Sequence, residues 1–509
     1  MPSDLPRLLD AEPVPSLDAY REGGGGAGLE AAARLGPAAV IEELEASGLR
    51  GRGGGGFPTG TKWRTVAGNA SPTNRATVVI NAAEGEPGSF KDRTLVSRNP
   101  YRILEGALIA AQAVAAHRVI VAMKASFTGE LARVRTAIRE LEEAGWADNV
   151  TMEVLEGPEE YLFGEESALL EVVEGRPPFP RVAPPFRHGA EEVDIEDDGR
   201  ARERQRAARR WGVGAQPPRQ RGEGDASAAD VQMAGTSGTA AAPTLANNAE
   251  TLANVPGILA NGPAWFRQLG TAESPGTIVC TVTGWVQRSG VGEVAMGTTL
   301  RQAITEIAGG PPPGNEIRAV LSGVANPFLP ASALDTPLTY EDMTAASNGL
   351  GAAGFMVFDD SVDLVAVAQG VARFLAVESC GQCTPCKQDG LAIAAVLDRF
   401  CRSNATEHDT EELSARLETV TDEARCYLAT QQQRVVNSLL ALFPEALSVH
   451  LETSPDRAAA VTPVLIAPLT RVGDGVATLD ETHTAKQPDW THDEIDSGTT
   501  PAERLDFRG

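Results

Sequence analysis

Cysteine, histidine, lysine and aromatic residues are all scarce in this chain of 509 residues. Six cysteines cannot form a dense disulfide framework in a chain of this length. Lysine is nearly absent, because only 5 of the 44 cationic side chains are lysine. Against 69 acidic residues, this leaves a formal net charge of −25. A surface that binds nucleic acid or an anionic membrane needs clustered positive charge, so the composition argues against both partners.

The sequence also lacks a secretory signal and a hydrophobic run long enough to span a membrane. Residues 1–20 contain no basic region followed by an apolar one. The longest apolar stretch, 107–123, is interrupted by Gln112, His117 and Arg118, whereas a span takes about 20 mainly apolar residues. We therefore interpret it as a buried helix followed by a strand. We expect a cytoplasmic protein, soluble or peripheral on the cytoplasmic face of a membrane complex.

Few aromatic residues, many acidic ones and arginine in place of lysine are typical of a protein that works in concentrated salt. Salt screens the self-repulsion of such a surface over a few ångströms. The composition therefore predicts a halophilic protein. The alternative is an ordinary acidic protein from a GC-rich genome, which also favours arginine and alanine.

One hydrophobic core rarely serves more than about 250–300 residues, so we expect several domains. Strand-like runs at 76–82 and 117–123 alternate with helical patterns at 38–49 and 131–145, which predicts an α/β sheet. Changes in composition predict five regions: a polar leader (1–35), the α/β region (36–267), a β-rich region (275–355), a helical region (356–450) and a polar, extended tail (451–509).

Within the α/β region, residues 188–242 show no lasting hydrophobic period. We expect them to form a mobile insertion. The alternative is a basic arm that docks an acidic partner.

The most specific motif reads ESCGQCTPCK. Cys380, Cys383 and Cys386 place a thiolate at every third residue, and a short loop of this kind can wrap three corners of a [4Fe–4S] cubane. The fourth ligand must come from elsewhere, and Cys401 and Cys426 are both candidates. Tetrahedral zinc is the rival, although zinc sites more often use paired C-x2-C elements.

A glycine-rich segment, GLRGRGGGGFPTGTKW, carries a second signal. Gly51, Gly53 and Gly56 satisfy the pattern G-x-G-x-x-G, and Phe57 and Lys62 follow it. Glycines let backbone N–H groups approach a phosphate, the lysine adds a positive charge, and the aromatic ring could stack on a planar ligand. The alternative is a flexible linker.

Three further segments place polar side chains where α/β proteins bind ligands. Glu84 and Glu86 directly follow the strand 76–82, where a carboxylate can hold ribose hydroxyls; the alternative is a solvated acidic turn. Glu165 and Glu166 open a helix, whose N–H groups would face the same ligand. The segment NNAETLANV (247–255) offers amides suited to the polar rim of a flavin.

In this order, the five segments resemble the NADH-binding flavoprotein subunit of respiratory complex I, the 51-kDa or F subunit. They also resemble its relatives in NAD-reducing hydrogenases and NAD-dependent formate dehydrogenases. The resemblance runs from about Ser16 to about Pro444. It implies a Rossmann-like FMN- and NADH-binding domain at 36–267, a ubiquitin-like β-grasp domain at 275–355, and a C-terminal four-helix bundle with a [4Fe–4S] cluster at 356–450.

The resemblance also assigns site residues. FMN would be held by the loop 51–60 and by Gly51, Arg52, Gly53, Lys62, Asn81, Glu84, Gly164, Glu165, Asn247, Asn248 and Thr251. NADH would lie against Phe57, Glu86, Tyr161, Glu166 and Phe186. The cluster ligands would be Cys380, Cys383, Cys386 and Cys426. The glutamate that matches Glu166 disfavours the 2′-phosphate of NADPH through like-charge repulsion.

The implied activity is that of an NADH dehydrogenase, which passes a hydride from NADH to FMN and single electrons to the cluster. The electrons would continue to an iron–sulfur partner, which in this family is normally a small thioredoxin-like [2Fe–2S] subunit. No catalytic protein acid is needed, and no histidine lies in the motifs. The sequence leaves open whether the parent complex is respiratory, hydrogenase-linked or formate-linked.

Three positions depart from the family's pattern: Ala83 replaces an aspartate, Ala183 a lysine and Thr65 an aromatic residue. Each would remove a contact near a bound cofactor. Two alternatives therefore stand beside the NADH dehydrogenase. One is a non-catalytic electron-relay or assembly subunit, and the other is a relative that uses NADPH or another electron donor.

Overall fold

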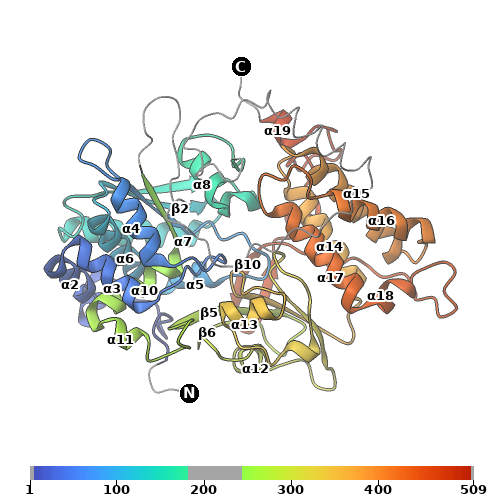
Figure 1. Cartoon of the computed structure of the whole chain (residues 1–509), viewed down its shortest axis with the longest axis horizontal. Coiled ribbons are helices and arrows are strands. Elements are labelled where there is room, and N and C mark those ends of the chain that lie inside the picture. Colours follow the sequence, from blue (N-terminus) through green and yellow to red (C-terminus); the bar gives the residue numbers. More distant parts are fainter. Residues whose placement is uncertain (1–4, 182–242, 506–509) are drawn as a thin grey trace, which may run out of the picture.

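The structure is a computed structural model, and it describes residues 5–181 and 243–505. Figure 1 shows three units: an α/β unit (blue to green) at one side, a helical unit (orange to red) at the other, and a smaller mixed unit (yellow) between and below them. The insertion predicted at 188–242 lies outside the described residues.

The α/β unit is built on a sheet of four parallel strands in the order β3-β2-β1-β4. Its strands are β1 (Thr77–Asn81), β2 (Arg118–Lys124), β3 (Thr151–Gly157) and β4 (Thr244–Asn248). The strands predicted at 76–82 and 117–123 are confirmed as β1 and β2. Since β1 and β4 run in register, Asn81 lies beside Asn248, and the carboxyl ends of both strands open onto one edge of the sheet.

Helices cover both faces of this sheet. Val78 and Ile80 of β1 face the larger core, whereas Val79 faces a smaller core on the opposite side. Apolar residues at successive positions are expected of parallel strands buried on both faces. The helices of the unit are α3 (Pro37–Ser47), α4 (Thr59–Asn69), α5 (Lys91–Arg98), α6 (Pro100–Ala113), α7 (Thr128–Glu143), the 3-10 turn η1 (Tyr161–Gly164), α8 (Glu166–Val173), α10 (Ala249–Asn261) and α11 (Pro263–Phe266). The stretch 107–123 is a buried helix followed by a strand, as predicted.

The polar leader expected at 1–35 is instead part of the first core. It contains α1 (Leu17–Glu22) and α2 (Ala27–Leu35). The buried carboxylate of Glu105 holds this segment in a defined structure. It accepts hydrogen bonds from the hydroxyl of Tyr20 (2.7 Å) and from the N–H of Gly26 (2.9 Å), at the start of α2. A negative charge at a helix N-terminus stabilises the helix, and here it also fixes the leader to α6.

The second unit contains a five-stranded mixed sheet in the order β6-β5-β9-β7-β8. Its elements are β5 (Thr277–Gly284), β6 (Gly290–Ala295), α12 (Leu300–Ala308), β7 (Ile317–Ser322), β8 (Leu329–Pro330), η5 (Ala331–Ala333), α13 (Tyr340–Ala345) and β9 (Gly354–Asp359). Strand β9 pairs with both β5 and β7, so this sheet extends beyond the boundary expected at 355.

The third unit is helical, as predicted for 356–450. Its helices are α14 (Leu364–Glu378), α15 (Thr384–Cys401), α16 (Glu407–Thr419), α17 (Leu428–Leu442) and α18 (Pro444–Ser448). Helices α14, α15 and α17 pack around one core that includes Leu375, Leu397 and Val435. The Phe443–Pro444 pair separates α17 from α18, since proline cannot continue a helix.

The extended tail expected at 451–509 is also corrected by the structure. It contains the hairpin of β10 (Leu469–Gly473) and β11 (Val476–Leu479), the turn η6 (Glu481–Thr484) and α19 (Pro501–Arg504). His483, Lys486 and Trp490 are buried. In Figure 1 the α19 segment lies against the orange helices. The composition of the segment is polar, but a few well-placed side chains attach it to the third unit.

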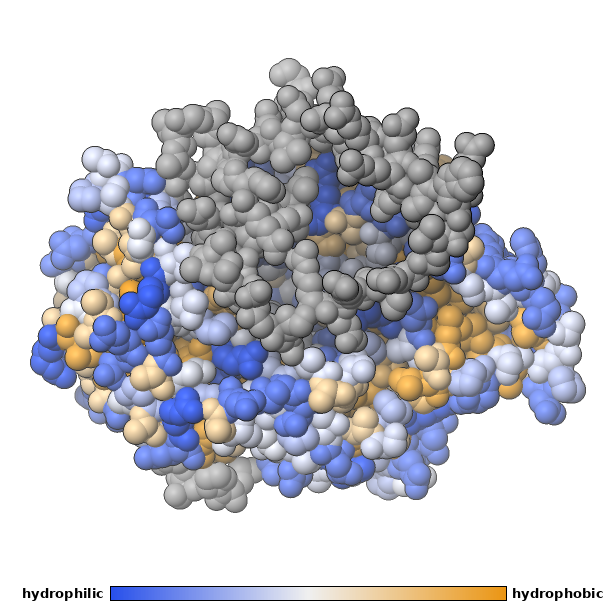
Figure 2. All heavy atoms as spheres, in the orientation of Figure 1, coloured by the Kyte–Doolittle hydropathy of each residue, from blue (hydrophilic) through white to orange (hydrophobic). Residues whose placement is uncertain are grey.

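No helix within the described ranges is both long enough and apolar enough to cross a membrane. Figure 2 shows hydrophilic residues over much of the described surface on this face, with hydrophobic residues gathered over the region of α17. Tyr427 and Leu442, which flank and end α17, are among the exposed large hydrophobic residues.

Candidate functional site

A cavity of about 720 Å³ opens at the carboxyl ends of β1 and β4. The second unit contributes Asn326 and Asn348 to its wall, and helix α17 contributes Gln431. All three units therefore meet there. Its volume falls in the range of about 300–1,000 Å³ that is usual for small-molecule sites, and the edge of a parallel sheet is the usual place for them.

The structure brings most of the predicted cofactor residues to this cavity. Those that line it are Gly51, Gly53, Phe57, Lys62, Asn81, Glu84, Glu86, Tyr161, Gly164, Glu165, Glu166, Asn247, Asn248 and Thr251. Phe186 lies outside the described residues. Arg52 is described but does not line the cavity.

The Arg52 side chain instead points away from the cavity and into the protein. It is 2% exposed and donates hydrogen bonds to the carbonyl oxygens of Pro275 (3.0 Å) and Thr277 (3.2 Å). Its backbone N–H donates to Oγ1 of Thr251 (2.8 Å). The guanidinium thus joins the glycine loop to the second unit and does not line the cavity.

The glycine loop presents bare backbone to the cavity. It ends where α4 begins, at Thr59. Gly56 has φ 60°, and a Cβ atom there would lie 2.5 Å from the Tyr340 ring. A Cβ atom on Gly53 would lie 3.2 Å from the Asn248 side chain. The loop therefore requires glycine, and its exposed N–H groups beside a helix N-terminus suit a phosphate.

Lys62 lies on the first turn of α4 and forms an ion pair with Glu166, the first residue of α8. The next residue, Trp63, is buried and donates from Nε1 to Oδ1 of Asn247 (2.9 Å). These two contacts join α4 to α8 and to the end of β4. They place a cation, a carboxylate and an amide on the same side of the cavity.

Glu84 caps helix α5 from inside the cavity wall. Its carboxylate accepts hydrogen bonds from Oγ of Ser89 (2.5 Å) and from the N–H groups of Lys91 (2.9 Å) and Arg93 (3.1 Å). Burial, reinforced by the nearby charge of Asp92, raises the pKa of Glu84. Both oxygens of this carboxylate are therefore engaged by the protein, Oε1 by Ser89 and Lys91 and Oε2 by Arg93.

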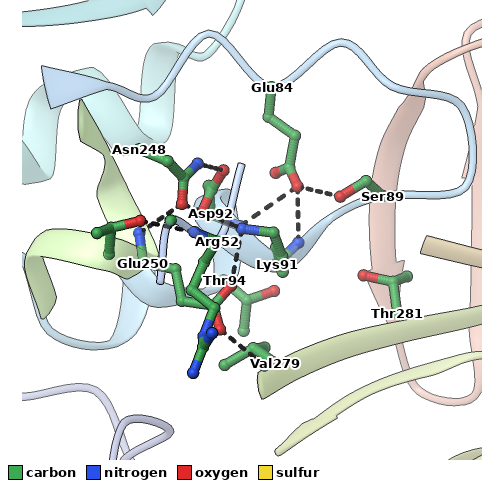
Figure 3. Close-up of polar contacts among 12 residues, drawn as sticks. Arg52, Glu84, Ser89, Lys91, Asp92, Thr94, Asn248, Glu250, Val279 and Thr281 are labelled. Carbon is green, nitrogen blue, oxygen red and sulfur yellow. Dashed lines mark hydrogen bonds and ion pairs between the residues drawn. The ribbon is translucent and has the colours of Figure 1, made fainter. Parts of the chain in front are cut away.

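Below Glu84 lies a network of buried charges (Figure 3). Lys91 is fully buried and pairs with Asp92 (2.8 Å) and Glu250 (2.8 Å). Burial alone would lower the pKa of Lys91, but these carboxylates raise it, so the lysine stays charged. Asn248 donates to Asp92 (2.7 Å), and its oxygen caps Glu250 at the start of α10 (3.0 Å). The network fixes the orientation of the Asn248 amide at the cavity.

Glu86 and Tyr161 meet at the opposite side of the cavity. The Tyr161 hydroxyl donates to Glu86 (2.6 Å), and Nε2 of Gln431 donates to that hydroxyl (3.0 Å). The backbone N–H of Val324 also donates to Glu86 (2.6 Å). Burial raises the pKa of the Glu86 carboxyl, partly offset by these hydrogen bonds. The loop after β1, η1, the second unit and α17 are thereby connected.

The entrance to α8 is also anchored at the cavity. Asn81, at the end of β1, donates from its side chain to the carbonyl oxygen of Gly164 (3.0 Å). Glu165 is the N-cap of α8 and accepts from the N–H of Ala168 (2.8 Å). The motif Gly164-Glu165-Glu166 therefore opens a helix at the cavity, as the sequence predicts.

Several lining residues were not singled out in the sequence. They are Ser89, Asp92, Asn326, Asn348, Gln431 and Arg434. Ser89 and Asp92 follow the acidic segment closely and could have been included from their neighbourhood. The other four come from the second and third units, and nothing in their local sequence distinguishes them from ordinary polar residues.

The three residues that depart from the family pattern, Ala83, Thr65 and Ala183, lie in different surroundings. Ala83 is buried in the small core on one face of the sheet, with Phe163 and Leu169. Thr65 donates to the carbonyl oxygen of Thr61 (3.0 Å) within α4. Ala183 lies outside the described residues.

The cysteine motif forms a second candidate site directly beside the cavity. Cys380 and Cys383 lie on the turn between α14 and α15, and Cys386 lies in the first turn of α15. Cys426 lies just before α17 on the same concave surface. Burial raises the pKa of the Cys386 thiol to about 11. Thiols of this kind are not reactive when free, and binding a metal would deprotonate them.

Cys401 does not belong to this group. It is fully buried at the far end of α15, 15 residues after Cys386, and a helix of that length spans about 22 Å. In the described part of the chain, no three Cys, His, Asp or Glu side chains converge closely enough to hold a single ion. Four thiols along one concave surface suit a cubane cluster, which takes one thiolate at each of its four irons.

Cys426 is common to both sites. Together with Leu162 and Leu428 it lines the cavity on one side and the concave surface of the cysteines on the other. A ligand in the cavity and a cluster held by the cysteines would thus be separated by these few side chains.

Two regions of the chain match known families. Residues 44–195 match the Nuo51 FMN-binding domain, and residues 366–450 match the NADH-ubiquinone oxidoreductase-F iron-sulfur binding region.

The chain is also similar to whole proteins. It is 32% identical to the F 2 subunit of NADH-quinone oxidoreductase from Rhizobium meliloti, over 88% of this chain and 98% of that protein. It is 31% identical to the HndC subunit of the NADP-reducing hydrogenase from Solidesulfovibrio fructosivorans, over 91% of this chain and 87% of that protein. It is 31% identical to the F subunit of NADH-quinone oxidoreductase from Aquifex aeolicus, over 85% of this chain and 90% of that protein.

Among solved structures, the chain resembles one of an NAD+-reducing [NiFe]-hydrogenase in the H2-reduced state. The TM-score is 0.69 and the sequence identity is 32%. The match covers 88% of this chain and 66% of that chain, so the chain described here spans just under two thirds of the hydrogenase chain.

Proposed function

This chain belongs to the family of the F subunit of NADH-quinone oxidoreductase, and we propose that it is the electron-input subunit of such a complex. It oxidises NADH and carries FMN and a [4Fe–4S] cluster. The observation that carries the proposal is the position of Cys426, which lines both the cavity and the cysteine site. A two-electron donor site and a one-electron relay are thus adjacent within one chain.

The residues of the cavity fit FMN by their chemistry. Backbone N–H groups of residues 53–56 in the glycine loop, before the start of α4, suit the phosphate, and Lys62 supplies a cation nearby. The amides of Asn81, Asn247 and Asn248 suit the ribityl chain and the polar rim of the ring. In this assignment the backbone of Arg52 belongs to the loop, while its side chain holds the loop to the second unit.

NADH would enter over the flavin, against Phe57, Glu86, Tyr161 and Glu166. Phe57 offers an aromatic face for stacking. Glu166 disfavours a 2′-phosphate by like-charge repulsion, although its ion pair with Lys62 reduces that effect. The preferred nucleotide is therefore NADH.

When bound, FMN supplies the conversion of a two-electron hydride transfer into single-electron steps. The side chains of this protein orient the partners rather than take part in bond making. Tyr161 and Glu86 hold each other in place, and Lys91 with its carboxylates keeps Asn248 oriented. Cys380, Cys383, Cys386 and Cys426 would hold the cluster.

The units correspond to the architecture proposed for the family. The five-stranded sheet with α12 would be the ubiquitin-like β-grasp domain, and α14 to α17 would form the four-helix bundle. A thioredoxin-like [2Fe–2S] subunit would dock near α17, where Tyr427 is 48% exposed beside Cys426. We place the protein in the cytoplasm of a salt-adapted cell, in keeping with its net charge of −25.

A reconstitution experiment tests this function. The protein is purified anaerobically, loaded with FMN, iron and sulfide, and mixed with NADH in concentrated salt. We expect bleaching of the flavin absorbance and reduction of ferricyanide, with NADPH much less effective. A loaded protein that bleaches with neither nucleotide would contradict the proposal and would favour the non-catalytic relay subunit.

A further inference from the structure

The carboxyl end of α14 holds a buried glutamate whose partners come from two distant parts of the chain. Glu378 is 2% exposed. One of its oxygens accepts a hydrogen bond from the backbone N–H of Tyr161 (2.9 Å). The other accepts from Nε2 of His483 (3.0 Å) and from Nζ of Lys486 (2.7 Å). The segment beyond residue 450, which neither matched family region includes, therefore reaches a residue that holds the cavity wall.

The same segment reaches Tyr161 by a second route, through aromatic rings. The His483 ring stacks on Phe374, with ring centroids 4.9 Å apart. Phe374 in turn meets the Tyr161 ring edge to face, at 5.3 Å. Tyr161 is thus fixed at its backbone by Glu378 and at its ring by Phe374, and His483 contacts both of these residues.

Residues 481–490, which we call the strap, are themselves firmly attached to α14. Arg373 donates to the carbonyl oxygens of His483 (3.1 Å) and Lys486 (3.3 Å). The indole of Trp490 donates to the carbonyl oxygen of Val377 (2.9 Å). These contacts hold His483 and Lys486 in place before any ligand binds.

The charge of Lys486 is essential to this arrangement. A carboxylate taken out of water needs an opposite charge and hydrogen bonds to remain in place. Without Lys486, Glu378 would lose the ammonium group that pairs with it at 2.7 Å, while the nearby Lys124 and Lys387 stay bound to backbone carbonyl oxygens. It would then turn toward water or draw water in, and the N–H of Tyr161 would lose its acceptor.

We propose that His483 and Lys486 are positioning residues of the nucleotide site, which hold Tyr161 in place through Glu378 and Phe374. The proposal rests on the proposed function in one respect, because it takes Tyr161 to contact NADH. The strap is then a feature by which this chain stabilises its NADH site from outside the family's common core.

The test compares Lys486→Met with Trp490→Phe in the full-length protein loaded with FMN and the cluster. Trp490→Phe is the matched control, because it removes a hydrogen bond between the strap and α14 but leaves the partners of Glu378 intact. Two quantities are measured: the KM and kcat of ferricyanide reduction by NADH, and hydrogen exchange without NADH in a peptide that contains Tyr161.

We expect Lys486→Met to raise KM about tenfold and to change kcat less than about twofold. Exchange at Tyr161 should become faster, while flavin content and the EPR signal of the cluster stay the same. Trp490→Phe should change neither KM nor this exchange. Unchanged KM and exchange in Lys486→Met, or equal changes in both variants, would overturn the proposal.

If Lys486→Met fails to fold, the test uses the double variant Glu378→Gln/Lys486→Met instead, in which both charges are removed. It should fold, because no unpaired charge is buried, and its KM should lie within about threefold of the wild-type value. A larger rise would mean that the pair does more than hold Tyr161. If the wild-type protein does not oxidise NADH at all, the proposed function fails, and the exchange comparison alone decides the role of the strap.

Discussion

Cys426 is the residue at which the two candidate sites meet. Along the chain it is separated from Cys386 by two helices, and nothing around it forms a motif. The structure places it with the three cysteines of the ESCGQCTPCK motif because α16 ends at Thr419 and the chain returns before α17. Cys401 follows the motif more closely in sequence but lies at the wrong end of a rigid helix.

Replacing Cys426 by serine should remove the [4Fe–4S] cluster, because a cubane that keeps only three thiolates loses the ligand of its fourth iron. Cys401→Ser should leave the cluster intact and serves as the control. EPR spectroscopy of the reduced, reconstituted proteins measures the outcome. A normal signal in Cys426→Ser together with a lost signal in Cys401→Ser would move the fourth ligand to Cys401.

Glu86 is the second residue whose setting leads to a measurable effect. Burial raises its pKa in the folded protein above the ordinary value of about 4.3. A raised pKa contributes stability that is complete below the unfolded-state pKa and is lost as the pH rises through the folded-state pKa. Ionisation of Glu86 therefore lowers the free energy of unfolding of the wild-type protein.

We expect the loss of stability caused by Glu86→Gln to be smallest at the higher pH. The difference in the free energy of unfolding between the two proteins, without NADH, should shrink as the pH rises from about 4 toward neutrality. Glu153→Gln is the control of opposite sign, because the hydrogen bond from Arg118 lowers the pKa of Glu153. Chemical denaturation at several pH values measures both, and parallel curves for the two variants would contradict the prediction.

At the scale of elements, the glycine loop and the helix that follows it act together, because the loop directs the N-terminus of α4 to the cavity. The positive φ of Gly56 turns the chain so that α4 begins with its N-terminus at the cavity. The turn is only possible without a side chain, since the Tyr340 ring occupies the space where Cβ would be. The pattern G-x-G-x-x-G therefore marks a real geometric requirement at this position.

Gly56→Ala should destabilise the protein by about 1–2 kcal/mol from the left-handed backbone alone, and more if the Tyr340 ring has to move. FMN retention after gel filtration should fall as well. Gly55→Ala, in the same loop, is the control for folding, because a Cβ atom there has no neighbour within 4 Å. Equal free energies of unfolding for the two apoproteins would show that the loop is not constrained at Gly56.

Two elements show where composition misleads. The leader and the tail are both polar on average, and the sequence therefore predicts only a polar leader and an extended tail. Glu105 caps α2 from 76 residues away, at Leu29, and Glu378 binds Lys486 from 108 residues away. Partners so distant in the chain cannot be found from local periodicity, because the contact exists only once the helices between them have packed.

For the whole molecule, the net charge of −25 sets the conditions in which the fold is stable. Two of the four buried lysines pair with carboxylates, Lys91 with Asp92 and Glu250 and Lys486 with Glu378, whereas Lys124 and Lys387 donate to backbone carbonyl oxygens. The excess acidic charge therefore acts mainly as repulsion at the surface. Such repulsion destabilises a compact state and falls as salt shortens the screening length.

The melting temperature should accordingly rise with added sodium chloride. The screening length falls from about 30 Å at 0.01 M to about 3 Å at 1 M, so most of the rise should occur within that interval. Calorimetry over a salt series measures it, with sucrose at matched osmolality as the control for general exclusion effects. A melting temperature that does not change with salt would contradict both the repulsion argument and the halophilic assignment.

The sequence by itself determined the parts of this protein whose reasons are local. Alternating strands and helices predicted the α/β sheet, and most of the residues predicted from the motifs and the family resemblance line the cavity. The spacing of Cys380, Cys383 and Cys386 predicted a cluster loop. Each of these follows from the geometry of a few consecutive residues.

Only the tertiary structure decided the rest. It turned the Arg52 side chain away from the cavity and attached the strap to Glu378, and it showed how Cys426, which the family resemblance had already favoured over Cys401, reaches the cluster loop. The physical reason is the same in all three cases. Each contact joins a buried charge or thiol to a group on another element, so it forms only where the two elements pack together. Such partners are chosen by the whole fold, after the local elements have formed.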